Sequence, residues 1–241
     1  MARGIRVKRH DWFSNFEIYS EAVEAFDTKA VRIDLSTWER RSLFELFGAY
    51  SEPYHGVCVR VDCTETFDYA KEQGISVFLS LLQRSLVAAN ETENFRLRVV
   101  DGAVLLYDTI HGGSAVGRAN GTIGFAHYAY RPKVLDFVRE AALEVERVKG
   151  RSDLERYEGQ NIIRYSVLPW FDFMSISHAR DFGTRDSAPK ITFGKITQAD
   201  GRRTMPVSIE GKTLSEKIGR CVVSGIGNGG GDKDPNRVLI A

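Results

Sequence analysis

The sequence has little of several features that would mark out particular classes of protein. Its 3 cysteines stand apart at Cys58, Cys63 and Cys221, which fits neither a disulfide framework nor a zinc site and suits a reducing compartment. No apolar run reaches the roughly 20 residues needed to cross a bilayer, and no apolar segment follows the basic start to form a signal peptide. These shortages predict a cytoplasmic protein that binds no metal.

An excess of charge of either sign is also missing. The chain has 33 Lys and Arg against 32 Asp and Glu, a net charge of +1, so no electrostatic argument favours nucleic acid or a membrane surface as partner. The histidines do not fall at a spacing typical of a metal or catalytic cluster. They are His10, His55, His111, His127 and His178.

Strand patterns are frequent in the chain. Apolar and polar residues alternate over several segments, as they do in half-buried strands. Two pieces at 95–100 and 103–107 flank Asp101-Gly102, and Asp200-Gly201 lies in a similar setting; Asp-Gly is a strong signal for a two-residue hairpin turn. The other alternating segments are 57–63, 123–130, 161–167, 191–193 and 206–209.

Helical patterns lie between these strands. Ser36 with Glu39 has the spacing of a capping box, which predicts a helix through Phe47. Residues 76–89 are apolar on several faces and predict a central, largely buried helix, while Pro132 suits the first position of another helix. Because strands and helices mix without regular alternation, the sequence predicts an α+β fold with a mixed, largely antiparallel sheet.

The stretch 161–209 is the most informative part of the chain. Leu168-Pro169-Trp170 ends its first strand, because proline cannot donate to a strand ladder, and leaves Ser166 just before the break. Thr192 stands on the neighbouring strand. From the residues alone, each hydroxyl is either an ordinary strand side chain or a donor to an oxyanion.

Together with these hydroxyls, a set of short motifs resembles the chloramphenicol acetyltransferase family over about residues 26–209. Each motif is weak alone, but their order and spacing are specific. They are D-L-S-T-W-E-R-R-S-L-F-E at 34–45, V-D-C-T at 61–64, N-F-R-L-R at 94–98, Tyr107-Asp108, Y-S-V-L-P-W at 165–170, S-H-A at 177–179 and P-K-I-T-F-G-K at 189–195.

The resemblance implies both a fold and a reaction. The fold would be the α+β acyltransferase fold, a large mixed, mostly antiparallel sheet flanked by helices, packed as a homotrimer with active sites at the subunit interfaces. The reaction would be transfer of acetyl from acetyl-CoA, as co-substrate, to a hydroxyl of chloramphenicol or a similar small molecule. A histidine would act as general base.

The resemblance also assigns roles to residues of this chain. Ser166 matches the serine that stabilises the tetrahedral oxyanion, and Thr192 matches the threonine that supports it through water. Arg40 matches the family's structural arginine. Leu46 and Phe47 match residues that line the acceptor pocket.

The chain departs from the family after the strand P-V-S-I. The family continues with His-His-x-x-x-Asp-Gly, but here Thr213 stands at the place of the base and Lys217 at the place of the aspartate that pairs the arginine. Threonine is no useful base near pH 7, and a lysine opposite Arg40 would be a like-charge pair. The departure predicts weak or absent acetyl transfer to chloramphenicol. If transfer persists, His178 is the first candidate for the base, because it is the histidine nearest in sequence to the site strands.

Composition changes at the same place. The 3 Trp, 9 Tyr and 14 Phe residues all lie at or before Phe193, and the tail is rich in glycine. A shifted reading frame near residue 211 or true divergence explains this; the second would favour a catalytically silent CoA-binding or small-molecule-binding trimer. The predicted organisation is therefore a peripheral extension at 1–25, an acetyltransferase-like domain at 26–209, and an aberrant tail at 210–241 whose residues 225–241 pack loosely.

Overall fold

The computed structural model describes residues 26, 28–155, 157, 159–179 and 187–212. The expected N-terminal extension at 1–25 lies outside these residues. So do Thr213, Lys217 and the rest of the tail, and the expectation of loose packing at 225–241 stays a prediction.

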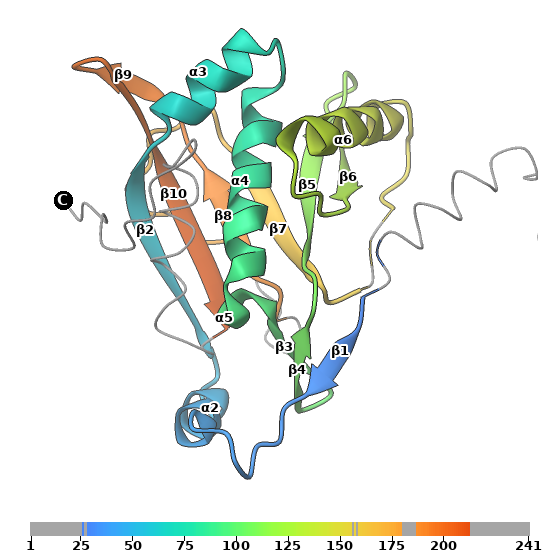
Figure 1. Ribbon diagram of the computed structural model, residues 1–241, viewed down its shortest axis with the longest axis vertical. Coiled ribbons are helices and arrows are strands. Elements are labelled where there is room, and N and C mark those ends of the chain that lie inside the picture. The colour runs from blue at the N-terminus through green and yellow to red at the C-terminus, as the bar shows by residue number, and fades with distance from the viewer. Residues whose placement is uncertain (1–25, 27, 156, 158, 180–186, 213–241) are drawn as a thin grey trace, which may run out of the picture.

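A large mixed sheet forms the centre of the protein (Figure 1). Its strands run in the order β2-β10-β8-β7-β5-β6, with β9 paired to β10. Only β5–β7 and β7–β8 among the pairs of described strands are parallel, which confirms the predicted mixed, mostly antiparallel sheet. The strands are β2 Tyr54–Asp62, β5 His111–Gly117, β6 Ile123–Tyr128, β7 Ile162–Val167, β8 Lys190–Phe193, β9 Thr197–Ala199 and β10 Arg202–Lys212.

Helices cover one face of this sheet. In Figure 1, α3 (Thr64–Glu72), α4 (Val77–Glu91) and α6 (Val134–Lys149) lie on the same side, with α4 across the middle. The alternating apolar residues of the strands face them: Tyr165, Ile191 and Val207 are buried in the same core as the leucines of α4. The prediction of a central buried helix at 76–89 is confirmed.

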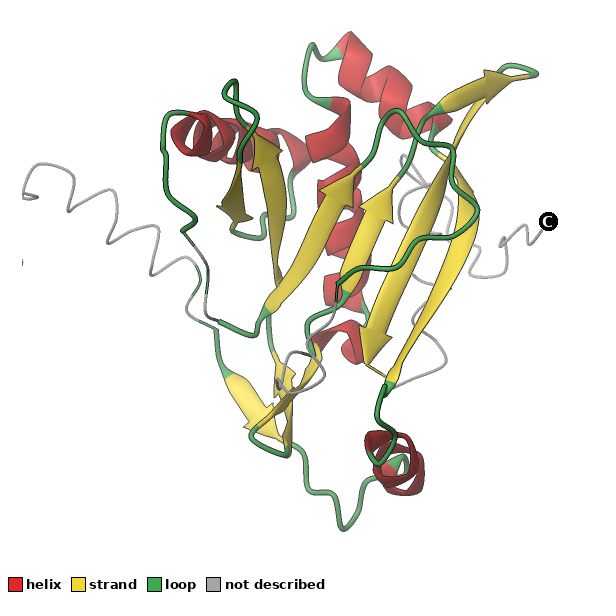
Figure 2. Cartoon of the chain, turned by 180° about the vertical axis from the view of Figure 1, so that it is seen from behind, coloured by secondary structure: helices red, strands yellow, loops and turns green. Residues whose placement is uncertain are grey.

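The opposite face of the sheet has no described helix on it (Figure 2). The chain after β7 crosses this face instead, passing over β10 and β2 before it returns to β8. The crossing segment, 168–179, is anchored by an ion pair of 2.6 Å between Asp172 and Arg60. This face carries the polar residues of the strands and is the face that matters for the site.

A small sheet and a short helix lie at one end of the molecule. The small sheet has the order β1-β4-β3, with β1 at Ala30–Arg32, β4 at Ala103–Tyr107 and β3 at Leu97–Val100. The helix α2, Arg41–Gly48, lies near it, and the single-turn helix α5, Glu93–Arg96, precedes β3. A separate apolar cluster of Leu97, Val99 and Val104 holds this end together.

A fully buried arginine joins the two sheets. Arg98 of β3 donates to the carbonyls of Gln160 and Ile162 at the start of β7, at 2.7 and 2.8 Å, and to those of Phe95 and Leu97 at 2.7 Å. These bonds satisfy the buried guanidinium. They fix where β7 begins, and so help to place Ser166 at its other end.

Both predicted hairpin turns are present. Asp101 and Gly102 have φ of 50° and 78°, and Asp200 and Gly201 have φ of 50° and 75°. Positive φ at both central residues is what a type I′ turn requires.

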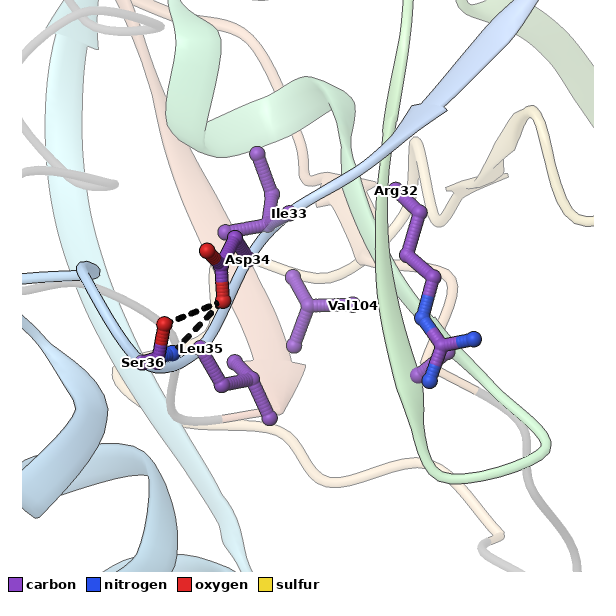
Figure 3. A pocket seen from close by; sticks show the side chains of 7 residues that line it. Arg32, Ile33, Asp34, Leu35, Ser36 and Val104 are labelled. Carbon is purple, nitrogen blue, oxygen red and sulfur yellow. Dashed lines mark hydrogen bonds between the residues drawn. The ribbon is translucent and has the colours of Figure 1, made fainter.

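Three local predictions were wrong. Ser36 caps no helix: its backbone N–H and hydroxyl both donate to Asp34 Oδ1, at 2.9 and 2.7 Å, in a turn, and α2 starts only at Arg41 (Figure 3). Pro132 precedes α6 by two residues, because Lys133 is extended and forms the N-cap. The segment at 95–96 belongs to α5, since a helical turn there lets Arg98 reach the carbonyl of Phe95.

Candidate functional site

A row of small polar side chains crosses the face of the large sheet opposite the helices. Ser166 of β7 pairs with Thr192 of β8, Thr192 with Ser208 of β10, and Ser208 with Cys58 of β2. Paired residues on adjacent strands point to the same side of a sheet. Because the residues before Ser166, Thr192 and Ser208 in sequence face the helices, this row faces away from them.

The structure therefore brings together the two hydroxyls that the sequence singled out. Thr192 is fully buried under the crossing segment, whereas Ser166 is half-buried at the end of its strand. The Ser166 hydroxyl makes no hydrogen bond with any residue that the structure describes. It is thus free to donate to a ligand, although its role as an oxyanion donor stays a prediction.

A histidine of the crossing segment contacts this row. His178 Nε2 lies 3.0 Å from Thr192 Oγ1, and His178 Nδ1 lies 3.1 Å from Oε1 of Glu210 on β10. The backbone N–H of His178 also points at Glu210 Oε2, at 3.4 Å. Since an ionised carboxylate only accepts hydrogen bonds, the proton of the neutral ring sits on Nδ1, and Nε2 accepts from the hydroxyl of Thr192.

Only part of this cluster was predictable from the sequence. His178 was predicted for its closeness in sequence to the site strands, whereas Glu210 was not predicted. The available signal was the strand period: Glu210 follows Ser208 by two residues and shares its face, in a strand whose other residues from 205 to 211 are apolar or small. A buried carboxylate there needs a partner, and His178 is one.

A cavity of about 220 Å³ lies beside Glu210. It is bounded by the row and by the crossing segment. Burial raises the pKa of the Cys58 thiol at its edge, although Arg60 opposes the shift, so this cysteine is a protonated thiol rather than a nucleophilic thiolate. The lining residues are Gly56, Val57, Cys58, Ser175, Ile176, Ser208 and Glu210.

A larger cavity, of about 440 Å³, lies elsewhere (Figure 3). It is formed by residues 32–36 with Ala103 and Val104, at the small sheet. None of its lining residues belongs to the large sheet, so its size does not make it part of the candidate site.

The remaining predicted site residues lie away from Ser166 and Thr192 within one chain. Arg40 donates to Asn94 Oδ1 and lies over the ring of Trp38, 5.8 Å from its centroid. Leu46 and Phe47 lie on α2, which Figure 1 places beyond the end of the large sheet; Leu46 is half exposed. A pocket between Ser166 and α2 would therefore need a second chain.

The described residues lack two further features. They contain no group of three or more His, Cys, Asp or Glu side chains that could hold a metal ion. Nor do they include a helix long and apolar enough to cross a membrane.

Sheet, helices and site together define an α+β acyltransferase fold. A solved chloramphenicol acetyltransferase superposes with a TM-score of 0.75 at 27% identity, over 82% of this chain and 98% of that one. The structure described as the cubic core of the pyruvate dehydrogenase multienzyme complex gives a TM-score of 0.53 at 15% identity, over 92% of this chain and 96% of that one. The second likeness concerns the fold alone.

The sequence places the chain within this class. The family model "Chloramphenicol acetyltransferase" matches residues 28–214, and the chain belongs to that family. A chloramphenicol acetyltransferase of Proteus mirabilis is 23% identical over 191 residues, which cover 76% of this chain and 87% of that protein. The family and its relatives support acetyl transfer as the class of function.

Proposed function

We propose that this protein is an acetyl-CoA-dependent O-acetyltransferase of the chloramphenicol type whose chain, as it stands, acetylates chloramphenicol weakly. The observation that carries the proposal is the register of β7 and β8, which sets Ser166 opposite Thr192 on the face of the sheet opposite the helices. The half-buried Ser166 hydroxyl, with no bond to another described residue, has the surroundings of a donor held ready for a ligand.

In the proposed reaction, a hydroxyl of the acceptor attacks the thioester carbon of acetyl-CoA in one ternary complex. Ser166 donates to the oxygen that becomes negatively charged, and Thr192, whose hydroxyl is bonded to His178 Nε2, lies beside it on β8. One such donor typically contributes about 10²–10³ in rate. Arg40 stabilises its loop, and Leu46 and Phe47 of a neighbouring chain contact the acceptor in a homotrimer.

The proposed reaction lacks the general base of the family. Thr213 occupies the position of the family histidine, and a threonine cannot take up a proton near pH 7. Loss of a general base costs about 10²–10⁴ in rate. We therefore expect slow acetylation of chloramphenicol by a protein that still binds acetyl-CoA in the cytoplasm.

One alternative has an observation in its favour. Thr213 and Lys217 replace both members of the family motif, as they would in a trimer that binds CoA or a small molecule without catalysis. Such a protein would keep the fold and the ligand site and lose the reaction.

The test is release of free thiol from acetyl-CoA by the purified protein, with and without chloramphenicol, alongside calorimetric binding of CoA. We expect chloramphenicol-dependent release that is about 10²–10⁴ slower than that of an active family member, and faster release by the Thr213→His/Lys217→Asp variant. Binding of CoA without release by either protein would favour the silent alternative. Turnover within an order of magnitude of an active relative would show that this chain has an efficient base.

A further inference from the structure

His178 differs from the other histidines of the described chain in what its ring contacts. His111 is buried against Phe26, and His127 packs on Tyr157. His178 alone among the described histidines has a ring nitrogen bonded to a residue of the row that contains Ser166. Its other ring nitrogen is bonded to a buried carboxylate.

We propose that His178, held by Glu210, is the proton acceptor of this chain and receives the proton through the hydroxyl of Thr192. This proposal rests on the proposed acetyl transfer. It gives the reaction a base that does not depend on position 213.

The spacing of the groups supports this assignment. Paired strands lie about 4.8 Å apart, so Thr192 lies one strand away from Ser166, and His178 Nε2 lies 3.0 Å beyond the Thr192 hydroxyl. Thr192 Oγ1, which is fully buried in the described chain, therefore lies between Ser166 and the imidazole. A carboxylate, an imidazole and a hydroxyl bonded in this order also occur in other enzymes. There the carboxylate orients the imidazole, and the imidazole accepts the proton of the hydroxyl.

Each bond change in the proposed step is balanced. The acceptor oxygen bonds to the thioester carbon while its proton moves to Thr192 Oγ1, and the proton of Thr192 moves to His178 Nε2. The carbonyl electron pair moves onto the oxygen, which Ser166 stabilises. When the carbonyl re-forms, the C–S bond breaks, and the sulfur of CoA leaves with the electron pair and regains the proton by the same path.

Charge around the ring favours this step. Glu210 is almost fully buried and lies at hydrogen-bond distance from Nδ1, so it stabilises the imidazolium that forms. Lys190 stands opposite Glu210 in the register of β8 and β10, and its Nζ donates to the carbonyl oxygen of Ala179 at 3.3 Å and lies over the ring of Tyr54. Arg164 lies beyond it on β7, exposed, and Arg60 is paired with Asp172.

The experiment compares His178→Asn with His127→Asn as a matched control that removes a histidine outside the row. We expect His178→Asn to lower thiol release by about 10²-fold or more with an unchanged KM for acetyl-CoA, and His127→Asn to leave it unchanged. Glu210→Gln should slow turnover with an unchanged KM for acetyl-CoA, because the ring loses the carboxylate that orients its Nδ1.

A second pair keeps the proposal testable if His178→Asn fails to fold. Thr192→Ser keeps the linking hydroxyl and should retain most of the turnover, whereas Thr192→Val should lose it. Equal turnover of Thr192→Ser and Thr192→Val, or of His178→Asn and the wild type, overturns the proposal about His178. If Ser166→Ala still slows thiol release in that case, the proposed acetyltransferase function stands. A wild type without turnover also overturns it, and release by Thr213→His then decides whether the proposed function survives.

Discussion

Ser166 and Thr192 are paired residues with different surroundings. Thr192 is fully buried and its hydroxyl is bonded to His178 Nε2, whereas Ser166 is half-buried and its hydroxyl has no described partner. The difference arises because β7 ends after Val167 and the chain turns at Pro169, while β8 lies beneath the crossing segment. The Ser166 hydroxyl can therefore bind a ligand, whereas the Thr192 hydroxyl is held by its bond to His178.

The first prediction concerns Ser166→Ala in a Thr213→His variant that turns over. Since the serine hydroxyl makes no bond with another described residue, its removal should leave the melting temperature within about 1 °C. Turnover should fall by about 10²–10³, the usual effect of deleting one oxyanion donor. Ser152→Ala, an exposed serine after α6, serves as control. A lower melting temperature without a specific loss of rate would show that Ser166 is structural.

The second prediction concerns His111 and stability at acid pH. His111 is 2% exposed, and its Nδ1 accepts from the backbone N–H of Tyr130 at 3.0 Å. Burial, aided by Arg131 and opposed by Asp108, lowers the pKa of His111 from 6.5 to about 4. As the pH falls, His111 therefore takes up a proton in the unfolded chain at a higher pH than in the folded chain. The contribution of His111 to the free energy of unfolding is complete above pH 6.5. It falls by about 3 kcal/mol as the pH falls towards 4.

Urea unfolding at pH 7.5, 5.5 and 4.5 measures this loss. The His111→Gln variant separates it from the protonation of carboxylates, because only the difference in pH dependence between the two proteins belongs to His111. Parallel curves of unfolding free energy against pH for both proteins would contradict the prediction.

At the scale of elements, α4 holds the core together. It crosses the middle of the sheet and buries nine of its side chains, including Leu79, Leu82 and Leu86. Its first turn is fixed by Ser76, whose hydroxyl accepts from the backbone N–H of Leu79 at 3.3 Å. A helix end without such a cap leaves backbone donors without partners.

The third prediction is that Ser76→Ala lowers the free energy of unfolding by about 1 kcal/mol, the usual cost of losing an N-cap. Ser36→Ala is a matched control, because Ser36 also seemed from sequence to cap a helix but caps none in the structure. It should change stability by less than about 0.5 kcal/mol. Equal losses in chemical denaturation would show that the Ser76 bond contributes nothing specific.

The elements also show how far sequence reasoning reaches. Both Asp-Gly turns were predictable because positive φ is a local demand that few residues meet. The start of α2 was not predictable in this way, because the Ser36 hydroxyl and N–H both donate to Asp34 Oδ1 in a turn, and the helix begins only at Arg41. The pair of His178 and Glu210 depends on where a long segment crosses the sheet, which no local pattern specifies.

At the scale of the whole molecule, the crossing segment gives an apolar surface to the sheet face opposite the helices. The crossing segment exposes Trp170, Phe171 and Met174 together, at 66%, 57% and 92%. Apolar side chains gathered in this way on a polar face are typical of an interaction site. The separation of Ser166 from Leu46 and Phe47 points in the same direction, since a second chain could bring an α2 to each row of hydroxyls.

The last prediction is that the protein is a homotrimer in solution with three times the 27.1 kDa mass of one chain. Light scattering coupled to size exclusion measures this mass directly. Met174→Glu should shift it towards the single chain, because a charge placed in an apolar interface must be desolvated without a partner. Leu143→Glu is the matched control: Leu143 is 70% exposed on α6, which covers the other face. A trimer should survive that change. A wild type that runs as a monomer would contradict the trimer, and a Met174→Glu variant that keeps the full mass would show that the crossing segment does not form the interface.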